Sequence, residues 1–298
     1  MGGPTGCVLV SYIDILGSLA VFGSDVIVSA EKAHMMIKRL LSRCRRILKR
    51  ISSNRDATQE IQKLYDEYDY LEAYSKHSDL RAKADPKSAV GGMWEEIGRL
   101  QYDFMTGKGL LSHHRMLDIG CGTLRGGRHF IKYLDHGNYT GIDISPEILK
   151  AADRLVDDEG LRVKKPTLLL NENKDLKFGQ FEDKTFDYLL AQSVFTHLMP
   201  EHIEECFENV GKVMHQESSF FFTFNLSSDL ARTGLKSFSY PYSFFSKLAD
   251  KHGLVIEDCQ NDYPHPRRRF SVRDIIDPAL YQEHHMVRLI RKTDRSDG

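Results

Sequence analysis

The chain has 298 residues, of which 41% are hydrophobic and 28% are charged, and its formal net charge is −1. This length and apolar content suffice for one sizeable domain with extensions, and the near-neutral charge excludes a global field that would draw the protein onto nucleic acid. Its cysteines lack metal-ligand spacing, so we expect no metal site and a reducing, cytoplasmic setting.

The first 34 residues are mostly apolar, but Asp14 and Asp25 interrupt the apolar run. No uninterrupted run reaches the ~18 residues that a membrane-spanning helix needs, and no basic segment precedes it as in a signal peptide. Two interpretations remain open, a short appendage or a translated leader upstream of a start at Met35 or Met36. We favour the leader, which would place residues 1–34 outside the fold.

Residues 35–60 contain a strongly basic stretch. Between Lys38 and Ile51 there are seven basic residues and no acid, and apolar residues recur at helical spacing. This pattern predicts a basic amphipathic helix. It could pack on the domain as a solvated helix, contact an anionic membrane surface through residues 38–51, or hold RNA phosphates, and nucleic acid is the least favoured of the three. A membrane contact would place the cytoplasmic protein at the inner membrane surface.

Residues 61–112 are expected to form a helical cap. Residues 61–84 are rich in tyrosine and acids and predict helices, which Asp85 and Pro86 end. Gly91 and Gly92 predict a flexible joint, and another helix follows over residues 93–105. Aromatic side chains of the cap either contact substrate or pack against a sheet, and packing is favoured.

Two glycines follow a short apolar run at residues 116–119. Gly120 and Gly122 can adopt backbone angles closed to other residues, and a second strand at residues 139–143 ends on an acid, Asp143. A carboxylate at that position can accept hydrogen bonds from both hydroxyls of a ribose. A nicotinamide dinucleotide site needs a third glycine where this chain has Arg125, and Asp118 suits an ammonium better than a pyrophosphate. S-adenosylmethionine, with a ribose and an amino acid, fits this pattern.

The remaining chain alternates between helices and strands. We predict helices over residues 124–133, 146–158, 200–214 and 242–252, and strands over residues 167–170, 186–191, 220–224, 254–258 and 285–290. This alternation predicts a mainly parallel sheet covered on both faces, with the last two strands paired as an antiparallel edge hairpin. Three arginines at 267–269 suggest contact with an anionic substrate, although a solvated loop is favoured.

The chain resembles a known family in three places. The sequence LDIGCG at residues 117–122 resembles motif I of class I S-adenosylmethionine-dependent methyltransferases, and GIDIS at residues 141–145 resembles their acidic second motif. Residues 186–198 resemble the fourth-strand motif of small-molecule-type members. The resemblance covers roughly residues 65–292. It implies a Rossmann-like, doubly wound, seven-stranded and mostly parallel sheet with an antiparallel last strand, formed by a methyltransferase core at residues 113–293.

One position departs from the family pattern. Leu124 stands where many members carry a third glycine. We therefore expect the turn to close differently, with Gly126 and Gly127 allowing close packing of helix against sheet.

The candidate site residues lie at the carboxyl ends of the strands. We expect the cofactor to contact Asp118, Gly120, Cys121, Gly122, Asp143, Ile144, Glu172, Asn173 and Gln192. Asp143 would take the ribose hydroxyls, Gln192 the methionine half or the substrate, and the 171–173 stretch the adenine, with Glu172 or Asn173 favoured. His197 is the candidate general base, and its equally weighted alternative is a role in holding the loop.

These patterns predict a methyltransferase that acts on an oxygen or nitrogen of a small molecule, such as a sugar, a lipid-linked precursor or a secondary metabolite. One alternative is a non-catalytic cofactor-binding or scaffold protein, against which the intact glycines and acids argue. The other is an RNA methyltransferase that uses the basic helix, against which the net charge of −1 argues.

Overall fold

The computed structural model describes residues 58–264 and 284–292. The expectations for residues 1–34, for the basic stretch at 38–51 and for the arginines at 267–269 lie outside the described residues. The chain divides into one unit that ends at Glu60 and a second that begins at Ile61. The fold presented here is that of the second unit.

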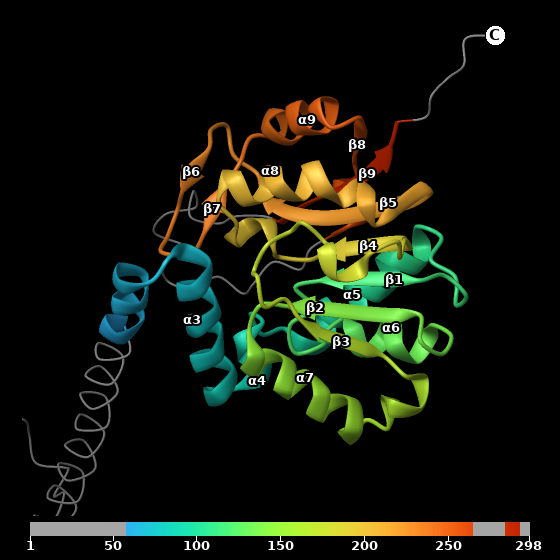
Figure 1. Ribbon diagram of the computed structural model, residues 1–298, viewed down its shortest axis with the longest axis horizontal. Helices are drawn as coiled ribbons and strands as arrows, with labels where there is room; N and C mark the ends of the chain where they lie inside the picture. Colours follow the sequence, from blue (N-terminus) through green and yellow to red (C-terminus); the bar gives the residue numbers. More distant parts are fainter. Residues whose placement is uncertain (1–57, 265–283, 293–298) are drawn as a thin grey trace, which may run out of the picture. The chain divides into compact units, whose positions relative to one another are not determined.

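Seven strands form one sheet in the order β3-β2-β1-β4-β5-β9-β8. Their bounds are β1 Met116–Ile119, β2 Tyr139–Asp143, β3 Thr167–Leu170, β4 Phe186–Ala191, β5 Met214–Asn225, β8 Leu254–Asp258 and β9 His284–Arg291. Strands β1 to β5 pair in parallel, whereas β9 is antiparallel to both β5 and β8. In Figure 1 the arrowheads of β4 and β5 point one way and that of β9 points the other. The predicted doubly wound sheet with an antiparallel last strand is confirmed.

Helices occupy the connections between strands. They are α3 Tyr70–Ala84, α4 Pro86–Ala89, α5 Trp94–Gly107, α6 Gly127–Tyr133, α7 Pro146–Asp158, α8 Pro200–Asn209 and α9 Tyr242–Lys251, and residues 61–67 are also helical. Helix α7 begins as its sequence predicts, because the Ser145 side chain accepts a hydrogen bond from the Ile148 amide and Pro146 fills the first turn. A separate pair of short strands, β6 Ala231–Arg232 and β7 Phe238–Ser239, lies between β5 and α9 in the chain.

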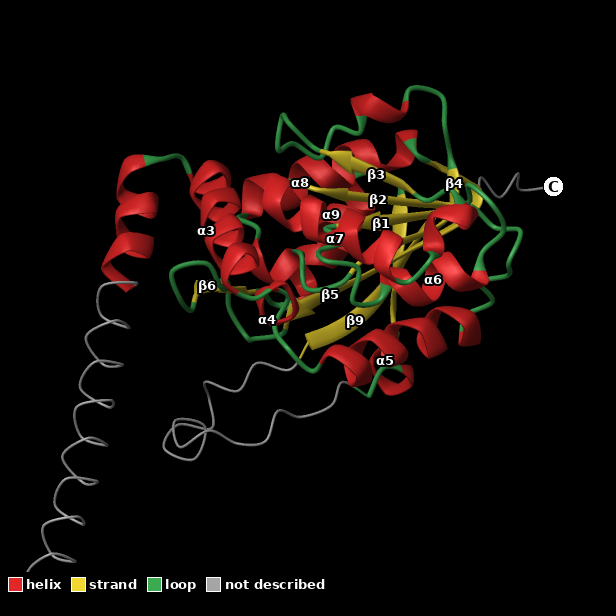
Figure 2. Cartoon of the chain, turned by 90° about the horizontal axis from the view of Figure 1, so that it is seen from below, coloured by secondary structure: helices red, strands yellow, loops and turns green. Residues whose placement is uncertain are grey.

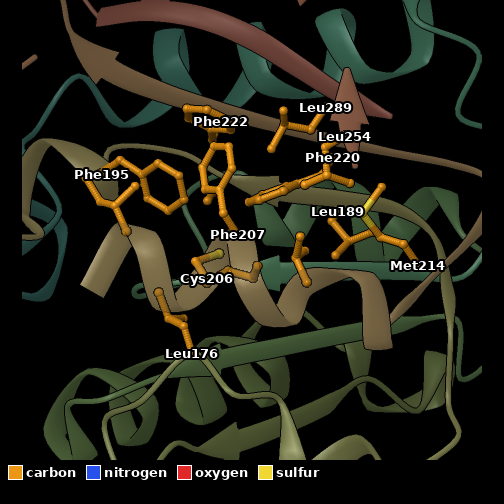
Figure 3. Close-up of a cluster of buried hydrophobic side chains, with 14 of the residues drawn as sticks. Leu176, Leu189, Phe195, Cys206, Phe207, Met214, Phe220, Phe222, Leu254 and Leu289 are labelled. Carbon is orange, nitrogen blue, oxygen red and sulfur yellow. The ribbon is translucent and has the colours of Figure 1, made fainter. Parts of the chain in front are cut away.

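Alternate strand residues face two apolar layers. Phe220 and Phe222 of β5 pack with α8 and α9, whereas Phe221 packs with α5, α6 and α7. Figure 3 shows the first layer, where Phe195, Phe207, Phe220 and Phe222 gather. Figure 2 shows α5 beside β5 and β9, where the ring centroids of Phe104 and Phe221 are 5.3 Å apart. Both faces of the sheet are therefore covered, as a parallel sheet requires.

The turn after β1 differs from its expected form. Leu124 adopts φ +66° and is fully buried, so this leucine keeps the left-handed backbone that glycine favours, and α6 begins only at Gly127. How this turn compares with that of family members that carry a third glycine stays a prediction. A Cβ at Gly126 would overlap Gln101 Oε1 of α5, and one at Gly127 would overlap the Tyr139 hydroxyl of β2. The predicted close packing of helix against sheet is confirmed at Gly127, whereas Gly126 packs closely against helix α5.

Two other boundaries differ from the sequence prediction. Helix α8 ends at Asn209 and continues as the 3-10 turn η4 Val210–Lys212. Strand β5 begins at Met214, because Met214 pairs with Phe186 ahead of an irregularity in the β4–β5 register. Within residues 58–264 and 284–292, no helix combines the length and the apolar character needed to cross a bilayer.

Candidate cofactor site

The glycine loop after β1 is tightly enclosed. Gly120 and Gly122 adopt φ +66° and +60°, a region that favours glycine. A Cβ at Gly120 would lie 2.6 Å from Val194 Cγ2, and one at Gly122 would lie 2.7 Å from Val90 Cγ1. Both the backbone angles and the close approach of two valines therefore require glycine here.

Asp143 at the end of β2 joins the glycine loop directly. The Gly122 amide donates to Asp143 Oδ2 at 3.1 Å, and the Ser145 amide donates to Oδ1 at 3.0 Å. Burial raises the pKa of Asp143 to about 6, while these backbone donors act in the opposite direction. Each carboxylate oxygen keeps a further lone pair, so the group can still accept two hydroxyl hydrogen bonds, as a ribose would supply.

Asp118 is buried beside the same loop. The Tyr139 hydroxyl donates to Asp118 Oδ2 at 2.7 Å, and the Asp118 residue is only 5% exposed. Burial raises the pKa of Asp118 to about 7, against the effect of the Tyr139 hydrogen bond. Tyr139 was not among the predicted site residues, and it reaches Asp118 because β2 pairs with β1.

Gln192 follows β4 and is held by the C-terminal part of the chain. Its Oε1 accepts a hydrogen bond from the Tyr263 hydroxyl at 2.9 Å. The neighbouring Ser193 has φ +59°, and its Oγ lies 3.1 Å from His284 Nδ1. Sequence reasoning missed Tyr263 and His284. The antiparallel direction of β9 could have indicated His284, since it brings the start of that strand to the edge where β4 ends.

The residues after β3 divide into buried and exposed positions. Asn171 is buried, and its Nδ2 donates to the Asp175 carbonyl at 2.6 Å, so its side chain holds the turn. Glu172 and Asn173 are exposed. An adenine contact by either of them stays a prediction.

The other two predicted contacts lie beside the glycine loop and Asp143. Cys121 is buried, and its Sγ would lie 2.9 Å from a Cβ at Gly141. Ile144 is half-buried, and its carbonyl accepts a hydrogen bond from Ser75 Oγ at 2.9 Å. Their roles toward a cofactor also stay predictions.

Helix α3 crosses the edge at which these residues meet. Besides the Ser75 hydrogen bond to Ile144, Asp79 Oδ1 accepts hydrogen bonds from Ser145 Oγ at 2.6 Å and from the Glu147 amide at 3.0 Å. Figure 1 shows α3 beside α7, on the side toward which β4 and β5 point. The cap therefore covers the carboxyl edge of β2.

His197 ends the short turn η3 Phe195–His197 beyond β4. Its Nδ1 lies 2.6 Å from the Lys236 carbonyl oxygen, its ring centroid lies 5.3 Å from that of Tyr74, and its own carbonyl accepts from the Tyr70 hydroxyl at 2.6 Å. Because the Nδ1 partner is a carbonyl, we assign the proton to Nδ1, which leaves the Nε2 lone pair free. Burial, together with the Lys236 charge, lowers the pKa of His197 to about 3, so the ring is uncharged at neutral pH.

The segment before α5 is tied to the turn after β1. Arg125 Nη1 donates to the carbonyls of Val90 at 2.7 Å and of Gly92 at 2.9 Å, and Thr123 Oγ1 donates to the Pro86 carbonyl at 3.0 Å. Arg125, which stands where a dinucleotide fingerprint has its third glycine, therefore connects the segment before α5 to the turn after β1. In the part of the chain that the structure describes, no group of three His, Cys, Asp or Glu residues could hold a metal ion.

Residues 117–220 match a family model described as a methyltransferase domain. This stretch contains the glycine loop, Asp118, Asp143, Gln192 and His197. The match shows a methyltransferase domain in this part of the chain, and the strand order agrees with the sheet expected from the resemblance to the class I family.

Solved structures of the same fold include proteins with different described activities. The [4+2]-cyclase SpnF is similar with a TM-score of 0.55 and 15% identity, over 74% of this chain and 96% of that one. DhpI in complex with SAH (S-adenosylhomocysteine) has a TM-score of 0.52 and 12% identity, over 75% and 97%. Magnesium protoporphyrin IX methyltransferase from Synechocystis PCC 6803 with bound SAH has a TM-score of 0.50 and 14% identity, over 75% and 97%. At such identities the likeness shows the fold.

Proposed function

We propose that this protein binds S-adenosylmethionine and transfers a methyl group to an oxygen or nitrogen of a small molecule, such as a sugar, a lipid-linked precursor or a secondary metabolite. The observation that carries this proposal is the hydrogen bond from the Gly122 amide to Asp143, which joins the glycine loop to the acid at the end of β2. Two similar structures, DhpI and the magnesium protoporphyrin IX methyltransferase, contain SAH, which supports the same ligand here.

The described residues suit the parts of this cofactor. Asp143 would accept the ribose hydroxyls, Asp118 and the 120–122 loop would face the methionine half, and Glu172 or Asn173 would contact the adenine. Cys121 and Ile144 would line the same site. When bound, the cofactor supplies a methyl group that is already activated on a sulfonium.

The chain must then bring a nucleophile into line and keep water out. Helix α3 places Tyr70 and Tyr74 over η3, and Tyr263 fixes the orientation of the Gln192 amide. The Gln192 Nε2, which lies 3.4 Å from both Ser193 Oγ and His284 Nδ1, would turn its N–H to the methionine half or to the acceptor when a ligand binds. Methylation of an amine needs no general base of its own, so the neutral His197 is compatible with either acceptor atom.

Calorimetry with SAH and with S-adenosylmethionine is the first test. We expect both to bind to the wild-type chain, and failure of well-folded protein to bind either would contradict the proposal. Cell extract incubated with radiolabelled S-adenosylmethionine then tests transfer, through identification of the labelled product. Since a fold relative is described as a cyclase, binding without any labelled product would favour a non-catalytic role or another reaction, and label in RNA would favour the RNA alternative.

A further inference from the structure

Three elements meet beside Asp143, namely α3, η3 and the loop between β6 and β7. Lys236 Nζ lies 5.4 Å from the centroid of the Tyr74 ring, which in turn packs against the His197 ring at 5.3 Å. The Lys236 carbonyl closes this arrangement through its 2.6 Å contact with His197 Nδ1. The side chain and the main chain of Lys236 are thus both fixed against the candidate site.

Tyr74 connects this arrangement to the ribose position. After burial, the charge of Asp143 is the strongest cause that raises the pKa of Tyr74, so the phenol lies within electrostatic reach of that carboxylate. Ser75, the next residue of α3, donates to the Ile144 carbonyl directly after Asp143. The Tyr74 side chain therefore lies between Lys236 and the expected ribose site.

Further basic groups lie within electrostatic reach of Lys236. Burial lowers the pKa of Lys236 to about 8, and the Arg81 charge acts in the same direction. Burial also lowers the pKa of His77 to about 4, and the charges of Lys236 and Arg81 add to that effect. Four basic side chains, Arg81, His77, His197 and Lys236, therefore act on one another at this point.

Within the described residues, no carboxylate forms an ion pair with Lys236 or Arg81. The Arg81 guanidinium donates instead to the Ser88 carbonyl at 2.7 Å. The nearby acids are engaged elsewhere. Asp79 accepts from Ser145 and Glu147, and Asp143 accepts from Gly122 and Ser145. Holding cations in a partly desolvated place without an acid costs stability, which an anionic ligand would offset.

We propose that Lys236 and Arg81 bind an oxyanion of the methyl acceptor, so that the acceptor is a small molecule carrying a carboxylate or phosphate group. This inference rests on the proposed function. The loop between β6 and β7 thereby selects the substrate, while Tyr74 forms the wall shared by the anion site and the ribose site.

Binding of small anionic probes to the full chain in saturating SAH tests this inference. Phenyl phosphate and benzoate are the anionic probes, and benzyl alcohol is their uncharged counterpart, with affinities measured by ligand-observed NMR. The variants are Lys236→Met, Lys236→Arg and, as a matched control, Lys247→Met, which changes an exposed lysine of α9. The two anionic probes also distinguish a phosphate from a carboxylate as the preferred group.

We expect Lys236→Met to lower the affinity for the preferred anionic probe by about 10- to 100-fold, as expected for the loss of a charge-assisted hydrogen bond. Lys236→Arg should retain most of the affinity, and Lys247→Met should match the wild type. The readout is the ratio of anionic to neutral probe affinity, which a general loss of folded protein does not change. An unaltered ratio in Lys236→Met, or equal wild-type affinity for benzyl alcohol and both anions, would overturn the inference.

Calorimetry with SAH on the same preparations separates the two proposals. If SAH binds but no anionic probe does, the acceptor inference fails while the proposed function stands. If SAH itself does not bind, the proposed function fails, and the acceptor inference fails with it.

Discussion

Asp118 is buried and Asp143 is half-buried, and the ionisation of both carboxylates bears on the proposed cofactor binding. Burial raises the pKa of Asp143 to about 6 and that of Asp118 to about 7. Ribose hydroxyls donate hydrogen bonds, so they need the ionised form of Asp143. Because both pKa values are raised in the fold, protonation of the two acids stabilises it. This contribution is fully present below about pH 4, near the ordinary pKa of an aspartate, and is lost as pH rises to about 6 to 7.

We expect the affinity for SAH to be constant at alkaline pH and to fall as pH decreases through about 7 to 6. Protonation converts the Asp143 carboxylate from a pure acceptor into a weaker partner for the ribose, and it removes the Asp118 charge that would face the ammonium. Calorimetry between pH 5 and pH 8.5 measures this dependence. In Asp143→Asn the change of SAH affinity that centres near pH 6 should disappear. A pH profile identical to that of the wild type would exclude Asp143 as the group whose ionisation controls binding.

Replacement of Asp143 by alanine should weaken SAH binding by about 1.5–3 kcal/mol, the range for hydrogen bonds to a charged group. The fold should survive, because the side chain lies at a strand end and its burial already disfavours the charge. Titration calorimetry compares this variant with Asp183→Ala, which changes an exposed acid. An unchanged dissociation constant in Asp143→Ala would show that another group takes the ribose.

The contacts of His197 favour its alternative role, that of holding the loop. Its pKa of about 3 is far below the near-neutral value that suits a general base, and its Nδ1 is bound to the Lys236 carbonyl. An asparagine amide can donate to the same carbonyl but cannot accept a proton as imidazole does. We therefore expect His197→Asn to keep most of the single-turnover rate, while His197→Ala loses more of it.

The acceptor identified from labelled extract serves as substrate for these rates. If both His197 variants lost about 10²–10⁴-fold in rate at unchanged SAH affinity, His197 would be the base after all.

Among the elements, α6 depends on its first glycine. A Cβ at Gly127 would overlap the Tyr139 hydroxyl and a methyl group of Leu124. Gly127→Ala should therefore lower stability by about 1–3 kcal/mol, as overpacking does, and should weaken SAH binding because Tyr139 positions Asp118. Thermal unfolding and calorimetry measure both effects.

Gly107→Ala is the matched control for that variant. Its Cβ would meet no atom within 4 Å, and Gly107 ends α5, so we expect an unchanged or slightly raised thermal midpoint. Equal midpoints for the two alanine variants would contradict the packing role of Gly127.

Elements with strong local signals were predictable from sequence. Strand β2 and helix α7 match their predicted bounds, because a short strand-like run that ends on an acid and a Ser-Pro start are local features. The start of α6 was not predictable, since a leucine with φ +66° is held there by its complete burial rather than by its intrinsic preference. The start of β5 was not predictable either, because residues 215–219 are polar and Met214 pairs with Phe186 of β4 only in the folded chain.

At the scale of the whole molecule, the site residues predicted from sequence lie at the carboxyl ends of strands. The site residues that the prediction missed lie in other parts of the fold. Tyr263 and Lys236 reach the site from loops that a local pattern cannot place. The family motifs indicate the proposed cofactor side, whereas the proposed acceptor side involves the cap and the β6–β7 loop, where the folded chain shows which groups meet.

Deletion of residues 1–34 should leave SAH affinity and the thermal midpoint unchanged. The contacts described around Asp143, Gln192 and His197 are all made by residues 70–284. Calorimetry and thermal unfolding of the truncated and full chains provide the comparison. A large fall in the midpoint would show instead that these residues stabilise the domain.

The position of β9 sets the order in which the sheet can be completed during synthesis. Among the described strands β8 pairs with β9 alone, yet β8 leaves the ribosome first. Until residues 284–291 emerge, β8 has no place in the sheet, and β5 presents an unpaired edge that carries Phe220, Phe222 and Phe224. Open apolar edges invite association between chains. A nascent chain stalled before residue 284 would therefore be a substrate for chaperones, and release of the last strand would end that exposure.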